Sequence, residues 1–288
     1  SDITAQDLFQ RLGITVQHEI EIIEHQLQRN GVRIIHGMAK FLDSHTVRIT
    51  SITGQSADYR AEKIVIATGT VPHRPDNIPF DDETIIDSDG LLQIKAIPRS
   101  MTVIGAGVIG VEYATIFSAL DAKITLVDNR NTILDFVDAD IVDEFRHDLM
   151  SRGIQLRLGE EVERVEKAGD GSVITHLKSG KRIRSDLLMV AAGRTGATGG
   201  LDLDKAGVPV DARGRLTVQP TYQTEVPHIY AVGDVIGFPA LASTSAEQGR
   251  LAACHAFGSS ADAATDYFPL GIYAVPEISI VGKTEQQL

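Results

Sequence analysis

A glycine-rich turn is the segment whose residue types and spacing are best suited to chemistry. Residues 105–110 read Gly-Ala-Gly-Val-Ile-Gly, which is the pattern Gly-x-Gly-x-x-Gly. An apolar strand is expected before this turn, at Met101–Ile104, and a helix after it, over 108–120. Because the backbone N–H groups of such a turn face a pyrophosphate at the positive end of the helix, the pattern predicts binding of a dinucleotide. A βαβ unit that binds no nucleotide is the alternative.

The residues of this turn have different expected roles. Gly105 permits the tight turn, and Gly107 lets the backbone approach the pyrophosphate. Gly110 allows the helix to press against the strand. Val108 and Ile109 complete the expected cofactor-binding turn.

A carboxylate and a guanidinium follow the second expected strand, Lys123–Val127. Asp128 lies 23 residues after Gly105, close to the spacing at which a carboxylate accepts hydrogen bonds from the adenosine ribose. This carboxylate favours NAD(H) and repels the 2′-phosphate of NADP(H). Arg130 either pairs with that phosphate or is an ordinary surface arginine. Asn129, between the two, belongs to the same expected site.

Other polar residues and glycines give weaker signals. Glu112, in the first turns of the expected helix, either is solvated or faces the nicotinamide end of the site. Asp234 follows an expected strand, Pro227–Val232, and is either a turn former or helix cap or a functional carboxylate. The small residues and glycines at 67–69 and 191–194 are, taken alone, only loop punctuation.

The elements that position these residues are predicted from periodicity and from turn signals. A first helix begins near Thr4 and Asp7, keeps an apolar face through Val16, Ile20, Ile23 and Leu27, and ends at Gly31. Strands are predicted at Arg33–His36, Thr46–Thr50, Arg60–Ala67 (with 64–67 buried), Gln155–Leu158 and Leu187–Ala191. Helices are predicted at Asp138–Arg152, with an apolar face of Ile141, Val142, Phe145 and Leu149, and at Ser243–Phe257. A loop is predicted over Thr70–Phe80, a solvated acidic turn at 81–83 and a turn at Asp170-Gly171.

Composition limits the function classes. The 288 residues carry 27 basic and 39 acidic side chains, a net charge of −12, which argues against nucleic acid or an anionic membrane surface as partner. The single cysteine, Cys254, excludes an internal disulfide and is interpreted as a packed small side chain. No apolar run reaches the roughly 18 residues of a membrane helix and no signal peptide opens the chain, so a cytoplasmic protein is expected. The histidines form no metal set, and no serine elbow is present.

Four motifs in this order resemble the pyridine nucleotide-disulfide oxidoreductase family. They are Ala67-Thr68-Gly69, the turn at 105–110, Ala191-Ala192-Gly193-Arg194, and Tyr230-Ala231-Val232-Gly233-Asp234. Within the family, further phrases are most similar to members that exchange hydride between two nicotinamide nucleotides. These include Glu112-Tyr113-Ala114, Gln248-Gly249-Arg250 and Pro276-Glu277-Ile278. The resemblance covers essentially the whole chain.

The resemblance implies an α/β fold of two Rossmann-like dinucleotide-binding domains. The NAD(P) domain, 98–222, is inserted into an incomplete FAD domain formed by 1–97 and 223–265, and a C-terminal dimerisation domain starts within 266–288. The family's own glycine turn for the FAD pyrophosphate and the region of its redox cysteines would precede Ser1. We therefore expect a central fragment that retains little flavin.

The resemblance also implies roles for residues that spacing alone does not assign. Asp234 would bind the ribityl chain of FAD, and Ala242 would open a helix whose positive end points at the flavin ring. No catalytic side chain is expected, and Glu112 is the best candidate to tune the contact between nicotinamide and flavin. The other implied cofactor-binding residues are Gly37 and Ala39 beside the adenine of FAD, Thr68 and Gly69 near the FAD, and Val162, Gly193 and Arg194.

The implied activity is transfer of a hydride from NADPH to FAD and from reduced FAD to NAD+. The cofactors are FAD, NAD and NADP, the partners are nicotinamide nucleotides, and the full-length protein is a homo-oligomer. A disulfide reductase similar to dihydrolipoamide dehydrogenase, with the same fold and cofactors, is one alternative. A nucleotide-binding fragment without activity is the other.

Overall fold

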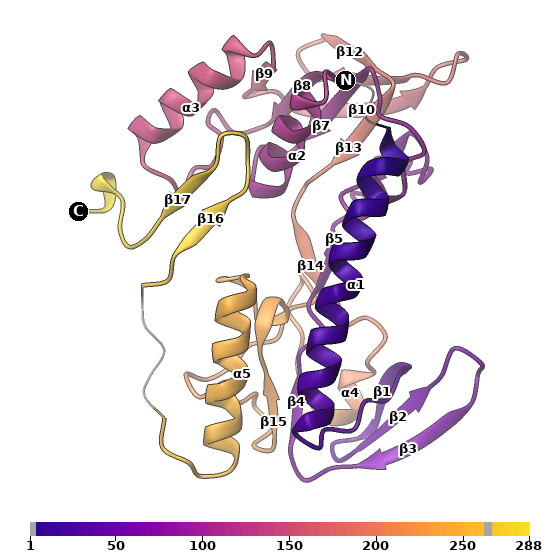
Figure 1. The fold of residues 1–288 in the computed structure, drawn as a ribbon, viewed down its shortest axis with the longest axis vertical. Coiled ribbons are helices and arrows are strands. Elements are labelled where there is room, and N and C mark those ends of the chain that lie inside the picture. Colours follow the sequence, from indigo (N-terminus) through magenta and orange to yellow (C-terminus); the bar gives the residue numbers. More distant parts are fainter. Residues whose placement is uncertain (1–3, 262–266) are drawn as a thin grey trace. The chain divides into compact units, whose positions relative to one another are not determined.

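A computed structural model describes residues 4–261 and 267–288, and the chain divides into two compact units (Figure 1). The first unit contains the residues up to Glu19, Pro72–Gly193 and Pro269–Leu288. The second contains Ile20–Val71 and Arg194–Phe268. The domain boundaries expected near 97, 222 and 265 stay predictions.

A five-stranded parallel sheet forms the centre of the first unit and confirms the α/β class. The glycine turn follows its middle strand, so the turn lies at the edge where the carboxyl ends of the strands meet. The strand order is β6 (Ile85–Asp87), β13 (Leu187–Val190), β7 (Ser100–Ile104), β8 (Lys123–Asp128) and β9 (Gln155–Leu158).

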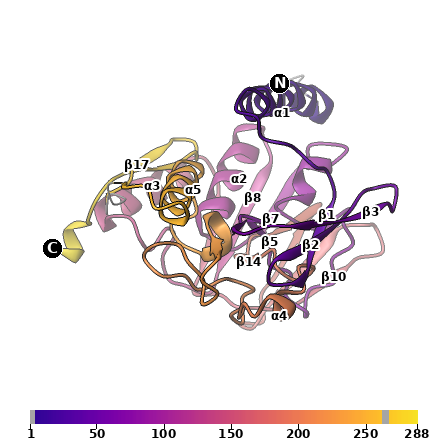
Figure 2. The ribbon, with the colours of Figure 1, turned by 90° about the horizontal axis from the view of Figure 1, so that it is seen from below.

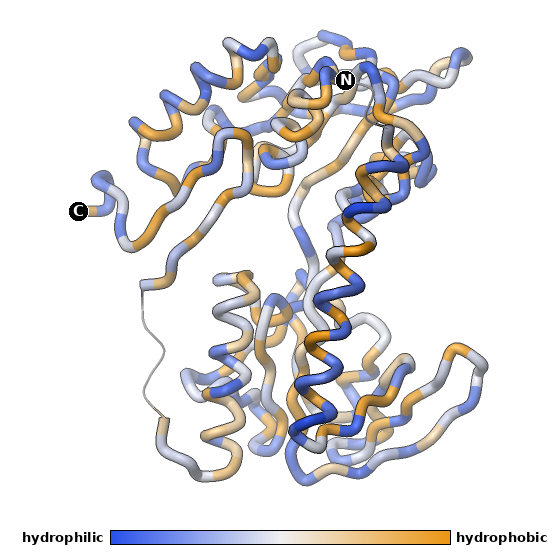
Figure 3. Tube along the Cα trace, in the orientation of Figure 1, coloured by the Kyte–Doolittle hydropathy of each residue, from blue (hydrophilic) through white to orange (hydrophobic). Residues whose placement is uncertain are grey.

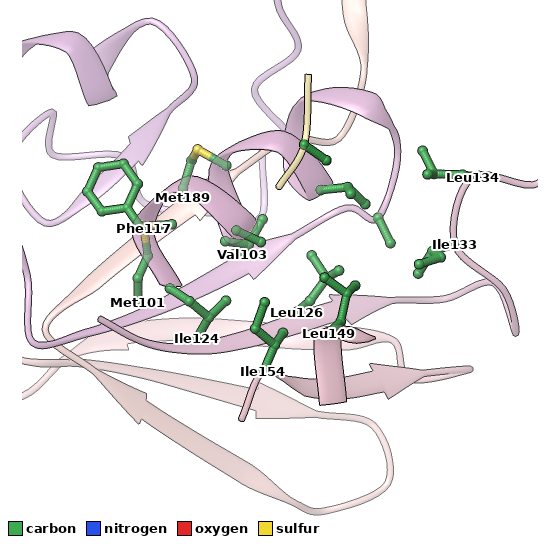
Figure 4. Close-up of a cluster of buried hydrophobic side chains, with 14 of the residues drawn as sticks. Met101, Val103, Phe117, Ile124, Leu126, Ile133, Leu134, Leu149, Ile154 and Met189 are labelled. Carbon is green, nitrogen blue, oxygen red and sulfur yellow. The ribbon is translucent and has the colours of Figure 1, made fainter. Parts of the chain in front are cut away.

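Two helices cover one face of this sheet. They are α2 (Val108–Ala119) and α3 (Ala139–Ser151), and their apolar residues share one core with β7 and β8 (Figure 4). Among the side chains labelled in Figure 4, Met101 and Val103 of β7 pack with Phe117 of α2, and Leu126 of β8 with Leu149 of α3. Side chains alternate along a strand, which leaves the intervening residues for the opposite face.

The opposite face is covered by an antiparallel sheet of β10 (Val162–Lys167), β11 (Val173–Leu177) and β12 (Arg182–Ser185). Val165 and Val173 of this sheet pack with Leu188 and Val190 of β13. The expected turn at Asp170-Gly171 joins β10 to β11. The unit also contains η1 (Gly90–Gln93), the hairpin of β16 (Leu270–Ile272) and β17 (Ile278–Ile280), and η3 (Glu285–Gln287).

The second unit combines a three-stranded antiparallel sheet, labelled in Figure 2, with a parallel strand pair. The antiparallel sheet contains β1 (Met38–Asp43), β2 (Thr46–Thr50) and β3 (Ser56–Arg60). The parallel pair is β4 (Ile64–Ile66) with β15 (Ile229–Ala231), and Phe41, Ile66 and Ala231 join both sheets in one core. The remaining elements are β5 (Thr70–Pro72) paired with β14 (Arg194–Gly196), α4 (Leu203–Ala206), η2 (Gly233–Ile236) and α5 (Ala242–Ala256).

The first helix, α1 (Ala5–Arg29), has the expected start but not a buried face. The Asp7 carboxylate accepts hydrogen bonds from Thr4 N and Oγ1 at 2.9 and 2.6 Å, and Asp7 N donates to Thr4 Oγ1 at 3.2 Å, which confirms the cap. Apolar and polar residues alternate along the helix (Figure 3). The expected apolar residues Val16, Ile20 and Ile23 are nevertheless 48%, 43% and 54% exposed.

Two expected strands differ from the structure. Residues 33–36 form no strand, because β2 ends at Thr50, opposite Met38, and offers them no partner. The run 64–67 is not buried throughout: Ile66 is buried, but Val65 is 45% exposed. The reason is that Ile64 and Ile66 point to the core on one face of β4, whereas Val65 points to the other face.

Smaller differences concern a loop and a helix. The expected loop over Thr70–Phe80 includes β5. On α3, Val142, Phe145 and Leu149 are buried, but Ile141 is 49% exposed because the buried stripe runs at the spacing 142, 145, 149. Within the described residues, no helix is both long and apolar enough to cross a membrane.

The acidic turn at 81–83 has a structural role that the sequence did not indicate. Asp81 Oδ1 accepts the backbone N–H groups of Glu83, Thr84 and Ile85 at 2.9, 2.7 and 2.8 Å. Asp81 Oδ2 accepts from Lys167 Nζ at 2.8 Å. Burial alone would raise the pKa of Asp81, but Lys167 and the three N–H groups outweigh burial and hold it well below the ordinary value.

Candidate functional site

The three glycines of the turn differ in whether the fold leaves space for a β-carbon: two positions have no such space and one has. Gly105 has φ of +106°, and a β-carbon there would overlap the Ala191 carbonyl. A β-carbon at Gly110 would overlap the Gly105 carbonyl oxygen and lie 3.4 Å from Val103 Cγ1. At Gly107 no atom lies within 4 Å of the β-carbon position. The space beside Gly107 therefore fits the close approach of a group outside the protein.

The start of α2 is left free for a ligand by its own residues. Gly107 is the N-cap of the helix and supplies no side-chain hydrogen bond to the first turn. Val108 and Ile109 are the first two helical residues and are half-buried. An uncapped helix N-terminus beside open space is suited to a phosphate oxygen.

Asp128 closes the turn from the end of β8. Its Oδ2 accepts from Ala106 N at 2.6 Å, and the residue is 6% exposed. Its remaining partners belong to Arg130: Oδ1 accepts from Arg130 N at 2.8 Å and Nε at 3.0 Å, and Oδ2 accepts from Nη2 at 2.9 Å. Burial alone would raise the pKa of Asp128, but the Arg130 guanidinium and these N–H groups outweigh burial and lower it.

Arg130 is therefore neither free nor an ordinary surface arginine. Its Nη1 also donates to Asp135 Oδ1 at 3.0 Å, so the guanidinium lies between two carboxylates. The pair with Asp128, opposed by desolvation, raises the pKa of Arg130 above its ordinary value. Asn129, between Asp128 and Arg130, is exposed. Asp135 was missed in the sequence, where it gave no signal beyond its charge.

Glu112 contacts a segment far along the chain. Its Oε1 accepts from Tyr273 N at 2.8 Å, so the carboxylate anchors the residues after β16 on α2. Thr115, one turn later on α2, accepts in the same way from Val275 N at 3.0 Å. The sequence did not predict this anchoring, and the expected position of Glu112 at the nicotinamide end of the site stays a prediction.

Two other expected residues of the first unit, Gly193 and Val162, differ in their distance from the glycine turn. Gly193 follows β13, has φ of +98° and has open space at its β-carbon position. The approach of Gly105 to the carbonyl of Ala191 brings this strand end beside the glycine turn. Val162, in contrast, starts β10 and packs on the apolar cluster around Val165. The expected role of Val162 in the nucleotide site stays a prediction.

In the second unit, the parallel pair β4–β15 brings two expected positions to one edge. Val232 N donates to Ile66 O at 3.0 Å, so Thr68 and Gly69 after β4 lie beside the segment that contains Asp234 after β15. Thr68 is exposed, and Gly69 has φ of +69°. The half-buried carboxylate of Asp234 has no hydrogen bond or ion pair with the described residues. It is thus not the cap of η2, although it lies in the first turn of that helix.

The start of α5 packs against the same edge. Ala242 is its first residue, as expected, and Leu241, the N-cap, supplies no side-chain hydrogen bond. Gln248, 5% exposed, accepts from Gly233 N through Oε1 at 2.7 Å and so ties α5 to the residue before Asp234. This positioning role of Gln248 was not predicted. The phrase Gln248-Gly249-Arg250 was noted only as a resemblance.

The remaining expected positions have structural partners. Arg194 donates from Nε to Thr70 Oγ1 at 2.8 Å and from Nη2 to Thr70 O at 2.9 Å. Gly37 lies against β2, where a β-carbon would be 2.6 Å from Thr50 O. Ala39 pairs with Ile49 in the β1–β2 ladder. The predicted residues therefore form two groups, one around the glycine turn and one around the β4–β15 edge.

Comparisons with known proteins show the family to which the chain belongs. The family model described as pyridine nucleotide-disulphide oxidoreductase matches residues 4–249. The soluble pyridine nucleotide transhydrogenase of Mycobacterium bovis (strain BCG / Pasteur 1173P2) is 48% identical over 99% of this chain and 61% of its own length. That of Colwellia psychrerythraea is 46% identical over the same shares. The chain thus spans about three fifths of the curated relatives it matches.

Solved structures give the same fold. LpdA from Mycobacterium tuberculosis is 26% identical, with a TM-score of 0.93 over 100% of this chain and 64% of LpdA. The HOCl-induced flavoprotein disulfide reductase RclA from Escherichia coli is 29% identical, with a TM-score of 0.88 over 97% of this chain and 64% of RclA.

Proposed function

Because the chain belongs to the pyridine nucleotide-disulphide oxidoreductase family, we propose that it serves flavin-dependent hydride transfer between NADPH and NAD+. The expected similarity to the transhydrogenases is confirmed by the 46–48% identical relatives that carry this name. The observation that carries the proposal is the open space at Gly107 beside the uncapped start of α2, with Asp128 hydrogen-bonded to the turn.

The nicotinamide nucleotide would bind across the carboxyl edge of the parallel sheet. Its pyrophosphate would lie beside Gly107 and accept hydrogen bonds from the N–H groups of Val108 and Ile109. Its adenosine ribose would lie by Asp128, at the end of β8. Gly105 and Gly110 hold the turn in the shape that this contact needs.

The residues of the second unit fit a flavin dinucleotide. Asp234 presents a carboxylate that the described structure leaves unpaired, suited to accept from ribityl hydroxyls. The start of α5, a 15-residue helix without a side-chain cap, would place its positive end toward the flavin ring and stabilise negative charge there. When bound, FAD supplies the hydride acceptor and donor, and the protein binds and orients it.

A disulfide reductase is the second candidate, favoured by the likeness to RclA, which is a flavoprotein disulfide reductase. The only cysteine of the chain, Cys254, lies on α5 and is half-buried. A reductase of this kind works through a cysteine pair, and the single cysteine of these 288 residues neither favours nor excludes it. The transhydrogenase proposal needs no thiol.

The two candidates differ in their second substrate. With FAD supplied, the chain should transfer hydride from NADPH to a thionicotinamide analogue of NAD+, followed by the absorbance of the reduced analogue. Dithiol-dependent reduction of NAD+ without this transfer would favour the disulfide reductase. Titration with NADH, monitored by calorimetry, tests the nucleotide site separately, and an absence of saturable binding would contradict the proposal.

A further inference from the structure

The carboxylate at the expected ribose position has every acceptor site taken within the protein. An ionised carboxylate has about four lone-pair sites. Those of Asp128 receive two backbone N–H groups, from Ala106 and Arg130, and two side-chain N–H groups, from Arg130 Nε and Nη2. The hydroxyls of an adenosine ribose therefore bind Asp128 only where the Arg130 side chain withdraws.

Only the side chain of Arg130 is free to make this movement. Its backbone N–H is held by Asp128 Oδ1 at 2.8 Å, and its carbonyl accepts from Gly159 N at 2.9 Å. The loop that follows is also fixed, because Leu134 is fully buried and its N–H donates to Ala106 O at 3.2 Å. Of the four N–H groups that donate to Asp128, only the two of the Arg130 side chain can therefore move away.

A second carboxylate is in place to hold the guanidinium after it leaves Asp128. Asp135 Oδ1 already accepts from Arg130 Nη1 at 3.0 Å. The Asp135 side chain is 50% exposed, compared with 5% for Asp128. Hydroxyls and water therefore reach the Asp135 carboxylate more easily than the Asp128 carboxylate. Arg130, 40% exposed, lies between them.

We propose that Asp135 is a specificity-determining residue of the nucleotide site, acting through Arg130. With NAD(H), the ribose hydroxyls take the place of Arg130 Nε and Nη2 on Asp128, and Asp135 retains the guanidinium. With NADP(H), the 2′-phosphate recruits the guanidinium, so that Asp135 competes with the phosphate for it. Asp135 thus favours NAD(H) over NADP(H), a role that rests on the proposed nucleotide site.

The test compares Asp135→Asn with a matched control, Asp143→Asn. Asp143 is 72% exposed and pairs with Arg146 at 3.2 Å, so its substitution makes the same charge change without touching Arg130. NADH and NADPH are titrated into each protein by calorimetry. An exposed ion pair is worth up to about 1 kcal/mol, so Asp135→Asn should lower the ratio Kd(NADPH)/Kd(NADH) by about two- to five-fold. Asp143→Asn should leave the ratio unchanged.

A double-mutant cycle shows whether the effect passes through Arg130. In an Arg130→Ala background, NADPH should bind more weakly, and most of the change caused by Asp135→Asn should disappear. Full persistence of that change would overturn the proposal, as would an unchanged ratio in Asp135→Asn or an equal change in Asp143→Asn. If the parent chain binds neither nucleotide, the proposed function fails and this inference fails with it. Binding of both nucleotides with an unaltered ratio rejects the role of Asp135 alone.

Discussion

Gly110 lies so close to Gly105 that a β-carbon at position 110 would overlap the Gly105 carbonyl oxygen. The first turn of α2 is thereby pressed onto the end of β7, and the helix start is held at the carboxyl edge of the sheet. Gly107, between these two glycines, has no such constraint. The same motif therefore contains positions required by folding and a position that only a ligand would require.

This difference predicts that two similar substitutions affect different properties, one mainly stability and the other mainly nucleotide binding. Gly110→Ala should lower the free energy of unfolding by about 1–3 kcal/mol or more, because the added methyl meets backbone. Gly107→Ala should lower it by less than about 1 kcal/mol, since its φ of −78° suits an L residue. It should still weaken NADH binding at least about tenfold, which is about 1.4 kcal/mol. Chemical denaturation and NADH titration measure both; unchanged NADH affinity in Gly107→Ala would exclude this turn as the site.

Asp234 should affect flavin binding without affecting stability. Its carboxylate has no partner among the described residues, so Asp234→Asn should leave the melting temperature unchanged. Asparagine keeps an oxygen acceptor but loses the charge, and a hydrogen bond to a charged group exceeds a neutral one by about 1–1.5 kcal/mol, so the affinity for FAD should fall about five- to tenfold. Titration with FAD, followed by flavin fluorescence, measures this fall. Asp204→Asn, an exposed substitution on α4, is the control. A destabilised Asp234→Asn that keeps its FAD affinity would show a structural residue instead.

Glu112 should control local opening of the segment after β16. Glu112→Ala removes the acceptor of Tyr273 N, and the lost hydrogen bond, about 0.5–1.5 kcal/mol, should speed amide exchange at Tyr273 by several-fold. Glu112→Gln keeps an oxygen acceptor and should change the exchange rate less. Hydrogen exchange resolved at Tyr273 and at Val275 distinguishes this effect from general loosening, because Val275 N is held by Thr115. Equal acceleration at both amides would contradict a specific role of Glu112.

Asp81 should contribute to stability in a pH-dependent manner. Its pKa is lower in the folded protein than the ordinary 3.8, so the unfolded chain binds the proton more readily. Its contribution is therefore complete at pH 7 and is lost as the pH falls below about 3.8 toward the lowered value. Asp81→Ala should reduce the free energy of unfolding at pH 7 by about 1–3 kcal/mol. Its stability should also fall less steeply in this acid range.

The adjacent Asp82 provides the control for this prediction. Its side chain is 64% exposed and pairs only with Arg74 in the described structure, so Asp82→Asn, which suits the φ of +58° at this position, should change stability and its pH dependence little. Denaturant unfolding at a series of pH values measures both variants. Parallel pH profiles for Asp81→Ala and the parent would contradict the assigned role of the carboxylate.

Local patterns in the sequence determined the order of elements around the glycine turn. The strand before it, the helix after it and the next strand all lie where periodicity predicted them. Each of these elements is specified by residues that are close together in the sequence. The glycine spacing indicated the turn for the same reason. The expected start of α5 at Ala242 rested on family resemblance and is also confirmed.

Partners of side chains depended on the packing of distant segments. Glu112 meets Tyr273, 161 residues away, and Asp81 meets Lys167, 86 residues away, and periodicity carries no information on either pair. Burial of Val65 likewise depended on which segments pack over each face of β4. Asp128 and Arg130 are only two residues apart, and the sequence predicted that both belong to one site. It did not predict that they form an ion pair, because the carboxylates around an arginine in the folded chain decide its rotamer.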